Sequence, residues 1–294
     1  MNQQKARGMM VVSMAIFGTI ALFVRAIPLP SAGIALCRAV LAAALIGGYL
    51  LVKKQCIDLG GIKKELTLLL LSGAAMGMNW ILLFEAYHYT SVSAATLSYY
   101  FAPALVTALC PVLFREKLTT RQLLCFVMAT AGVVMITGVS SLESKRDLIG
   151  VLLGLGAAVL YATVILLNKF IRGVGGIHRT FLQFLSAILV LTPYVLLTGG
   201  LRFTDMTGTG WMSLLMVGLV HTGVTYCLYF TAMKDLPGQK TAILSYIDPL
   251  AAVILSVTVL HEGLTLMQGI GGLLILGFTL LGELPEGTSL RKQG

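Results

Sequence analysis

The residues best suited to chemistry are a few polar side chains inside long apolar runs. Asp248 lies in AILSYIDPLAAVILSVTVL and His221 in SLLMVGLVHTGVTYCLYF. An acidic side chain near the middle of a bilayer costs about 2.5–3.5 kcal/mol, so it usually faces a partner or a water-filled path. We expect Asp248 to bind a cationic group or to carry a proton. The alternative is a neutral or paired acid bonded to a neighbouring helix.

Several polar and aromatic side chains reach a similar depth if these runs are helices. At 1.5 Å per residue, Asp248 lies roughly 13 Å along a helix from Gln239, and His221 about 18 Å from Thr209. His221 is expected in a proton relay or, alternatively, as a satisfied structural residue. The side chains expected to contact a substrate, or equally to serve in packing, are Asn79, Trp80, Tyr99, Tyr100, Tyr226 and Tyr246.

Motifs for ATP hydrolysis and metal binding are missing from the sequence. It contains no G-x-x-x-x-G-K-[ST], and HEGLT at 261–265 is not H-E-x-x-H. The five cysteines have no spacing typical of a metal site or a disulfide framework. We therefore expect no catalytic residue, no metal and no cofactor.

Composition places these residues in a membrane protein. Of 294 residues, 57% are hydrophobic and 11% charged, whereas soluble domains carry about 25% charged residues. The apolar runs are continuous and about 20 residues long, which favours helices over barrel strands. We predict an all-α integral membrane protein with ten transmembrane helices, at 8–26, 31–52, 66–87, 92–114, 119–138, 148–170, 178–198, 209–233, 239–260 and 264–283.

The basic residues of this chain, with its net charge of +9, gather at helix ends. With the N-terminus in the cytoplasm, most of them fall in cytoplasmic segments, as the positive-inside rule requires. We predict a multi-pass protein of the bacterial cytoplasmic membrane, with both termini cytoplasmic and no nucleic-acid partner. Arg25 and Lys169, near helix ends, are expected to extend to the membrane interface. Arg38 lies about ten ångströms into its helix, so it needs a partner.

An internal repeat divides the chain. Segment 84–122 aligns without a gap on 230–268. The identical pairs include Tyr100 and Tyr246, Pro103 and Pro249, and Glu116 and Glu262. Asp248 aligns with Ala102, so the acid is present in one copy and the proline in both. Both prolines are expected to bend their helices and to free carbonyls one turn earlier.

Each copy of the repeat contains five helices, and an odd number reverses the orientation of the second copy. We predict two inverted five-helix repeats, 1–140 and 141–286, and a cytoplasmic tail, 287–294. Inverted repeats are typical of secondary transporters with alternating access. In each copy a Glu is followed by a capping box before the last helix, at Thr119 and Gln122 and at Thr265 and Gln268. We assign these residues, including Glu116 and Glu262, to the turns.

On these features the sequence resembles the drug/metabolite transporter superfamily, and within it the EamA-like ten-helix transporters. The resemblance rests on the two repeats, on YYFAPALVTALCPVLFREKLT and YIDPLAAVILSVTVLHEGLT, and on ALCRAVLAAAL. It implies a bacterial inner-membrane transporter of small metabolites. The range of that family includes amino acids, other polar metabolites and toxic organic compounds.

The expected function is secondary active transport by alternating access. The chain is expected to export a small metabolite, an amino acid or a related polar or amphipathic compound, across the bacterial cytoplasmic membrane. Its expected partners are the lipid bilayer, the substrate, and protons or another ion, and ten helices in one chain favour a functional monomer. The alternatives are a non-transporting sensor or accessory subunit and a membrane-embedded lipid-modifying enzyme.

Overall fold

The structure is a computed structural model that describes residues 3–55, 59–114, 119–143, 145–171, 173–174, 176–199, 201, 203–233, 236 and 244–283. Every regular element in these ranges is helical. The elements are α1 (Gln3–Gly18), α2 (Ile20–Arg25), α3 (Ser31–Val52), α4 (Leu59–Tyr89), α5 (Val92–Tyr99), α6 (Ala102–Phe114), α7 (Thr120–Glu143), α8 (Lys145–Phe170), α9 (Gly176–Leu197), the short 3-10 helix η1 (Phe203–Asp205), α10 (Gly208–Leu215), the π-helix η2 (Met216–Val224), α11 (Thr225–Met233), α13 (Ile247–Thr258) and α14 (Leu266–Glu283).

Six helical segments in the described ranges are long and apolar enough to cross a membrane, judged by length and composition. These segments are Gln3–Arg25, Ser31–Val52, Ile62–Tyr89, Lys145–Asn168, Gly176–Leu197 and Gly208–Tyr229. The shorter apolar helices are Val92–Val106, Leu123–Met135, Ile247–Thr258 and Leu266–Leu281. Each predicted segment therefore contains an apolar helix, and the prediction of an all-helical membrane protein is confirmed.

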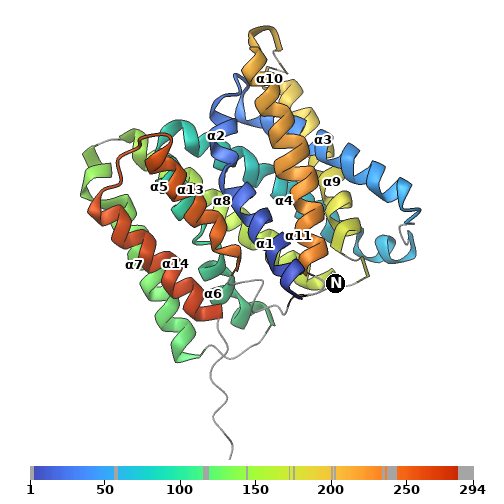
Figure 1. Cartoon of the computed structure of the whole chain (residues 1–294). Helices are drawn as coiled ribbons and strands as arrows, with labels where there is room; N and C mark the ends of the chain where they lie inside the picture. Colours follow the sequence, from blue (N-terminus) through green and yellow to red (C-terminus); the bar gives the residue numbers. More distant parts are fainter. Residues whose placement is uncertain are drawn as a thin grey trace, which may run out of the picture.

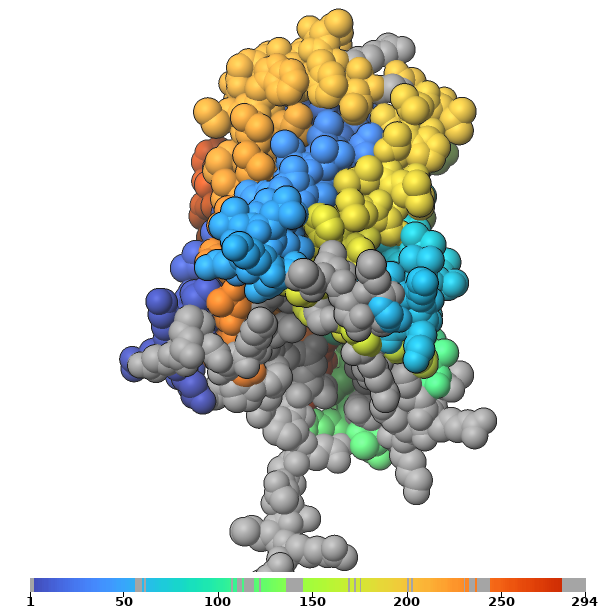
Figure 2. Space-filling view, turned by 90° about the vertical axis from the view of Figure 1, so that its right-hand side faces the viewer, coloured from blue at the N-terminus to red at the C-terminus, as the bar shows by residue number. Residues whose placement is uncertain are grey.

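The helices pack as a bundle with α4 in the middle and α3 at one side (Figure 1). The long helix α4 lies against α8 and α9, and α3 lies against α9 and η2. On another side, α1 packs on α11 and α13, and α7 and α14 run side by side at one flank. Figure 2 shows the face on which α3 lies between α9 and the helix formed by α10 and η2.

The bundle has apolar side chains on its outside and several polar ones within. Leu189 and Leu196 on α9 are 65% and 71% exposed, and Val159 on α8 is 54% exposed. In contrast, Arg38 and His221 are 5% and 1% exposed. An apolar surface around a partly polar interior is the arrangement that a bilayer stabilises, because lipid tails cannot solvate polar groups.

Among the described residues three predicted helices are interrupted: the first, the fourth and the ninth, which has a turn at Tyr246, three residues before Pro249. The first, 8–26, separates into α1 and α2 at Thr19, a break that the hydropathy pattern does not predict. The fourth, 92–114, separates into α5 and α6 just before Pro103. This second break has the predicted cause, because Pro103 has no N–H to donate to the carbonyl four residues earlier.

The predicted helix 209–233 contains an unexpected π-helical segment, η2. Within or just after it, the hydroxyls of Thr222 and Thr225 donate to the carbonyls of Val217 and Val220, five residues earlier, each at 2.7 Å. Hydropathy reports only that a helix is apolar, so it does not distinguish π from α geometry. The predicted transmembrane helix is present as one continuous apolar segment, Gly208–Tyr229, and its middle part has π rather than α geometry.

The ends of the remaining helices differ from the predicted ends for identifiable reasons. The helix predicted at 66–87 begins at Leu59, because the charged residues 63–65 continue the helix beyond its apolar part. The capping box before α14 is present, since Thr265 N–H donates to Gln268 at 3.1 Å and Gln268 N–H to Thr265 at 3.2 Å. The tail 287–294, Glu116 and the side chain of Gln122 lie outside the described residues.

Candidate functional site

Residues 17–19, which break the first predicted helix, contact three of the predicted site residues. The phenylalanine ring of this segment lies 5.2 Å from the ring of Tyr226, measured between centroids. A Cβ atom on its glycine would lie 2.6 Å from the carbonyl oxygen of Asp248. Its threonine hydroxyl lies 2.7 Å from Nε2 of His221. Three distant parts of the sequence therefore meet at this helix break.

The carboxylate of Asp248, in the first turn of α13, accepts a hydrogen bond of 2.5 Å from the Tyr100 hydroxyl. Tyr100 is the residue at which α5 ends, and its ring packs edge-on against Tyr99 at 5.6 Å. Tyr99 stacks in turn on Tyr161 of α8 at 5.2 Å. The hydrogen bond between Tyr100 and Asp248 joins the break after α5 to the start of α13. A bond of this kind is required by the alternative interpretation, in which Asp248 is a structural acid bonded to a neighbouring helix.

His221 in η2 has a partner at each ring nitrogen, as the structural alternative requires. Nδ1 lies 3.0 Å from the Met216 carbonyl, which only accepts, so Nδ1 carries a hydrogen. Nε2 faces the Thr19 hydroxyl, which also lies 2.8 Å from the Ile16 carbonyl. When His221 is neutral, the single hydroxyl hydrogen of Thr19 has two acceptors, Nε2 of His221 and the Ile16 carbonyl. When His221 is protonated, Nε2–H donates to Thr19 and the Thr19 hydroxyl donates to Ile16, so all three contacts are hydrogen bonds. The role of the Thr19 hydroxyl therefore changes with the charge of His221.

Arg38 of α3 is a buried cation held by a hydroxyl and by aromatic faces. Its Nε donates to Thr222 Oγ1 at 2.6 Å, and its guanidinium carbon lies 4.3 Å from the centre of the Trp80 ring. Trp80 packs on Phe184 at 5.6 Å, and Phe184 packs on Tyr226 at 5.5 Å. Within the described ranges, no carboxylate forms an ion pair with Arg38. Its charge is therefore stabilised by cation–π contact rather than by an acid.

Some predicted contact residues are already engaged within the protein. Asn79 is 2% exposed and donates to the Ala157 carbonyl at 2.6 Å, which joins α4 to α8. One face of Trp80 is covered by Arg38. Tyr246, the repeat counterpart of Tyr100, is 8% exposed. In this conformation Asn79 serves helix packing and Trp80 positions Arg38, while Asp248 and Tyr100 form the polar centre.

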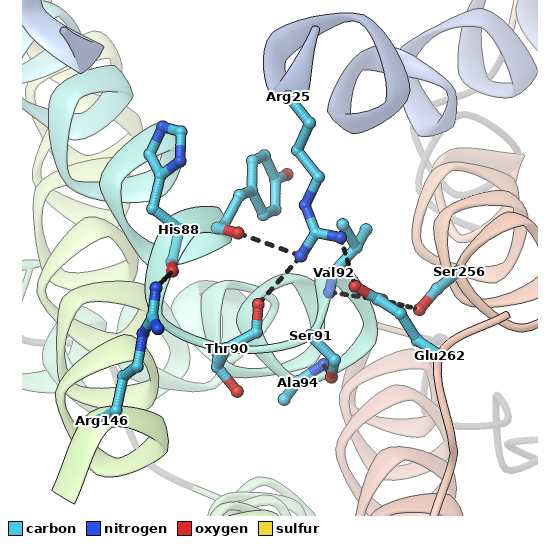
Figure 3. Close-up of polar contacts among 10 residues, drawn as sticks. Arg25, His88, Thr90, Ser91, Val92, Ala94, Arg146, Ser256 and Glu262 are labelled. Carbon is cyan, nitrogen blue, oxygen red and sulfur yellow. Dashed lines mark hydrogen bonds and ion pairs between the residues drawn. The ribbon is translucent and has the colours of Figure 1, made fainter. Parts of the chain in front are cut away.

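A second polar network lies at the end of the bundle where α2 ends (Figure 3). The Arg25 guanidinium forms an ion pair with Glu262 and donates to two carbonyls at the end of α4, at 3.0 and 3.1 Å. Glu262 also accepts from the first N–H of α5 at 2.8 Å and from a hydroxyl of α13. We call this set the Arg25–Glu262 network: Arg25, Tyr87, Thr90, Val92, Ser256 and Glu262.

The backbone of the loop between α13 and α14 fixes the position of Glu262. His261 has φ of 53°, a left-handed conformation that disfavours residues with a Cβ atom. The chain then folds back, so that the N–H of Glu262 donates to the Ser256 carbonyl at 3.0 Å. The loop backbone at Glu262 is therefore held against the end of α13, and the Glu262 carboxylate is directed at Arg25.

This network adds a partner to the prediction for Arg25, which was expected to extend to the membrane interface. Its side chain is 28% exposed and forms an ion pair with Glu262. Glu262 does lie in the predicted turn, but its carboxylate also binds α5. The partners are 237 positions apart, so only the predicted topology, which places both at one side of the membrane, was a signal for their pairing. The side chain of Lys169 lies outside the described residues.

In the described part of the chain, no group of three or more His, Cys, Asp or Glu side chains is placed to hold a metal ion. Two clusters contain charged side chains, with Asp248 and Arg38 in the centre and Arg25 and Glu262 at one end. The arrangement suits reversible binding of charged groups inside a membrane.

Comparison with known proteins agrees with this architecture. The model of the EamA-like transporter family matches the chain twice, over residues 5–138 and 148–281. The uncharacterized transporter YxxF of Bacillus subtilis (strain 168) is 29% identical over 287 residues, covering 97% of this chain and 89% of that protein. An uncharacterized transporter of Archaeoglobus fulgidus is 28% identical over 274 residues, covering 92% of this chain and 93% of that protein.

A solved crystal structure has a similar fold. It superposes with a TM-score of 0.67 at 16% sequence identity, covering 94% of this chain and 96% of that one. At this level of identity the likeness concerns the arrangement of helices, and the side chains of the two clusters have to be interpreted from this chain alone.

Proposed function

This chain belongs to the EamA-like transporter family of membrane transporters, and we propose that it is a secondary active exporter of a small metabolite. In this proposal two inverted five-helix halves, 1–140 and 141–286, move about a central site and expose it to each side in turn. The two separate matches of the family model, over 5–138 and 148–281, support the division into halves.

The observation that carries the proposal is the hydrogen bond between Tyr100 and Asp248. It links a helix break in the first half to a helix start in the second. Pro103 and Pro249 lie in the first turns of α6 and α13, and neither has an N–H to donate to the turn before it. A backbone carbonyl that loses its helical donor inside a membrane must face protein or water. Movement of the halves about this point would break one bond and uncover the carboxylate.

The charges around this bond favour an amino acid or a related compound as the substrate. Asp248 in the first turn of α13 supplies a carboxylate, and Arg38 of α3 is a buried cation. A substrate with an ammonium and a carboxylate group compensates both charges, whereas a singly charged one leaves one of them uncompensated. The rings of Tyr99 and Tyr226 supply the aromatic surface beside these charges.

Proton coupling is proposed for Asp248 and His221. Protonation of His221 adds one hydrogen bond to its chain of contacts with Thr19, at the break between α1 and α2. The same break lies against Asp248 through Gly18. A proton on His221 therefore acts directly on this segment, against which the α13 backbone at Asp248 packs, and this is a physical route from proton binding to helix movement. Arg38 donates to Thr222, the residue that follows His221, so a buried cation lies next to this segment of η2.

We further propose a functional monomer in the bacterial cytoplasmic membrane with both termini in the cytoplasm. The exposed apolar faces of α8 and α9 would contact the bilayer. Lys5 and Arg7 at the start of α1 support a cytoplasmic N-terminus. In that orientation, the end of the bundle that carries Arg25 faces the outside of the cell.

The experiment uses the purified protein in liposomes. A thermal-shift screen against amino acids, organic cations and nucleosides first selects the compound that most stabilises the folded protein. Its flux is then measured for the parent, for Asp248→Asn and for the matched control Asp205→Asn, an exposed residue of η1. We expect at least about tenfold slower flux and an altered pH dependence for Asp248→Asn only, equivalent to about 1.4 kcal/mol. A folded Asp248→Asn protein with parental flux and pH profile would refute the site.

A further inference from the structure

The Arg25–Glu262 network places charges at two helix ends that favour them. Arg25 donates to carbonyls at 3.0 and 3.1 Å where α4 ends, so the cation faces the negative end of that helix. Glu262 accepts from the first N–H of α5 at 2.8 Å, so the anion faces the positive end of that helix. Each charge is stabilised by a helix dipole and by the opposite charge. The network is therefore a built contact rather than an incidental surface pair.

This contact crosses from one half of the chain to the other. Arg25 and the ends of α4 and α5 lie within the first match of the family model, 5–138. Glu262 and the end of α13 lie within the second, 148–281. A relative movement of the halves at this end therefore has to break the ion pair and the bond from Glu262 to α5.

The network is also accessible enough to open. The side chains of Arg25 and Glu262 are 28% and 15% exposed, and they border an open pocket with a volume of about 400 Å³. Water in that pocket can solvate both charges once they separate. A partly exposed pair gains far less from its attraction than a dry one, so its separation is a modest step.

A polar stripe leads from this network to the central site along α5. Ser93, Thr96 and Tyr100 are spaced i, i+3 and i+7, which places them on one face of the helix. Ser93 is 2% exposed, and its hydroxyl has no hydrogen-bond partner in the part of the chain that is described. Tyr100 donates to Asp248 at the other end of the stripe. An unpartnered buried hydroxyl between two polar clusters indicates a place that is solvated in another conformation.

From these observations we propose that the Arg25–Glu262 network is the gate at this end of the transport path, and that the path follows the Ser93 face of α5 to Asp248. With the ion pair formed, the gate is closed and α5 is held to the loop before α14. With the pair broken, α5 separates from that loop and the Ser93 face becomes accessible to water. This proposal rests on the proposed transport function, to which it adds a gate at the outer end of the transport path.

The test is the accessibility of a cysteine at Ser93 in the full-length protein. Ser93→Cys is made in a background whose five native cysteines are replaced. A membrane-impermeant thiol reagent is applied to right-side-out and to inside-out vesicles, and the labelling rate is measured. We expect slow labelling in the parent. Glu262→Gln should label about tenfold faster from the Arg25 side, equivalent to about 1.4 kcal/mol, and no faster from the opposite side.

Glu85→Gln is the matched control, because Glu85 accepts from Ser31 at 2.6 Å and lies outside the network. It should label at the parental rate. Ser256→Ala, which removes one donor to Glu262, replaces Glu262→Gln if that variant does not fold, and is expected to label faster to a smaller degree. Equal rates for the parent and folded network variants would overturn the gate. Labelling needs no substrate, so this outcome is independent of whether flux is observed.

Discussion

Replacement of Gly18 by alanine tests whether the close approach of α1 to α13 holds the central site together. A Cβ atom at Gly18 would lie 2.6 Å from both Ala251 Cβ and the Asp248 carbonyl oxygen. Carbon atoms pack best at about 3.5–4.0 Å, so α1 and α13 would have to separate by about 1 Å. Overpacking of this kind typically costs about 1–3 kcal/mol.

Gly8 in the same helix provides the matched control. A Cβ atom at Gly8 meets nothing within 4 Å, so Gly8→Ala receives only the gain in helix propensity, about 1 kcal/mol. Gly18→Ala gains at most the same stability from helix propensity, and it loses stability through the contact of its Cβ atom with α13. The two variants should therefore differ in stability by about 1–3 kcal/mol, and Gly18→Ala should be the less stable one.

The measurement is thermal unfolding of the parent and both variants in one detergent, at one heating rate because such unfolding is often irreversible. We expect Gly18→Ala to melt several degrees below Gly8→Ala and to transport more slowly, since its α1 is displaced from Asp248. If Gly18→Ala melts at or above Gly8→Ala, the two helices do not approach as closely as the structure shows. The account of the helix break as a contact point would then be wrong.

Two further predictions concern single hydrogen bonds. Tyr100→Phe removes the donor to Asp248 and should change the pH dependence of transport while the protein stays folded. Tyr194→Phe, at an exposed tyrosine of α9, should behave like the parent, and equal pH profiles for both variants would contradict the role of this bond. Thr265→Ala removes the acceptor of the capping box and should lower the free energy of unfolding by about 1 kcal/mol, measured by thermal or denaturant unfolding. An unchanged stability would show that this cap is not needed to start α14.

The sequence predicted the helices of this protein better than the breaks within those helices. Long apolar runs are sufficient to locate membrane helices, because the cost of polar backbone and side chains in lipid is large and acts on every residue. The break before Pro103 was predictable for a local reason, the missing N–H of proline. The break at Thr19 has no such signal in the residues themselves. It depends on contacts of Gly18 and Thr19 with α13 and η2, which belong to other parts of the chain.

The candidate site shows the same division between local and long-range information. The depth arithmetic placed Asp248 and Tyr100 at one level, and they are hydrogen-bonded in the structure. It did not show that Asn79 is used to hold α8, because a buried amide needs a partner and sequence does not identify which carbonyl is near. Arg38 was recognised as a charge that needed a partner, whereas Arg25 was assigned to the membrane interface. Their partners became evident only when the fold brought distant residues together.

The π-helix η2 has a consequence for comparing relatives of this chain. A π-helix bonds each residue to one five positions away, whereas an α-helix uses four, so the segment Met216–Val224 accommodates extra chain length within the same helix. One residue corresponds to a rotation of about 100° in an α-helix. A homologue with a one-residue gap here would present another residue at the position of His221. Residues in the same column of a sequence alignment would then not be structurally equivalent on one side of the gap. Such residues should be matched by the helix face that they occupy.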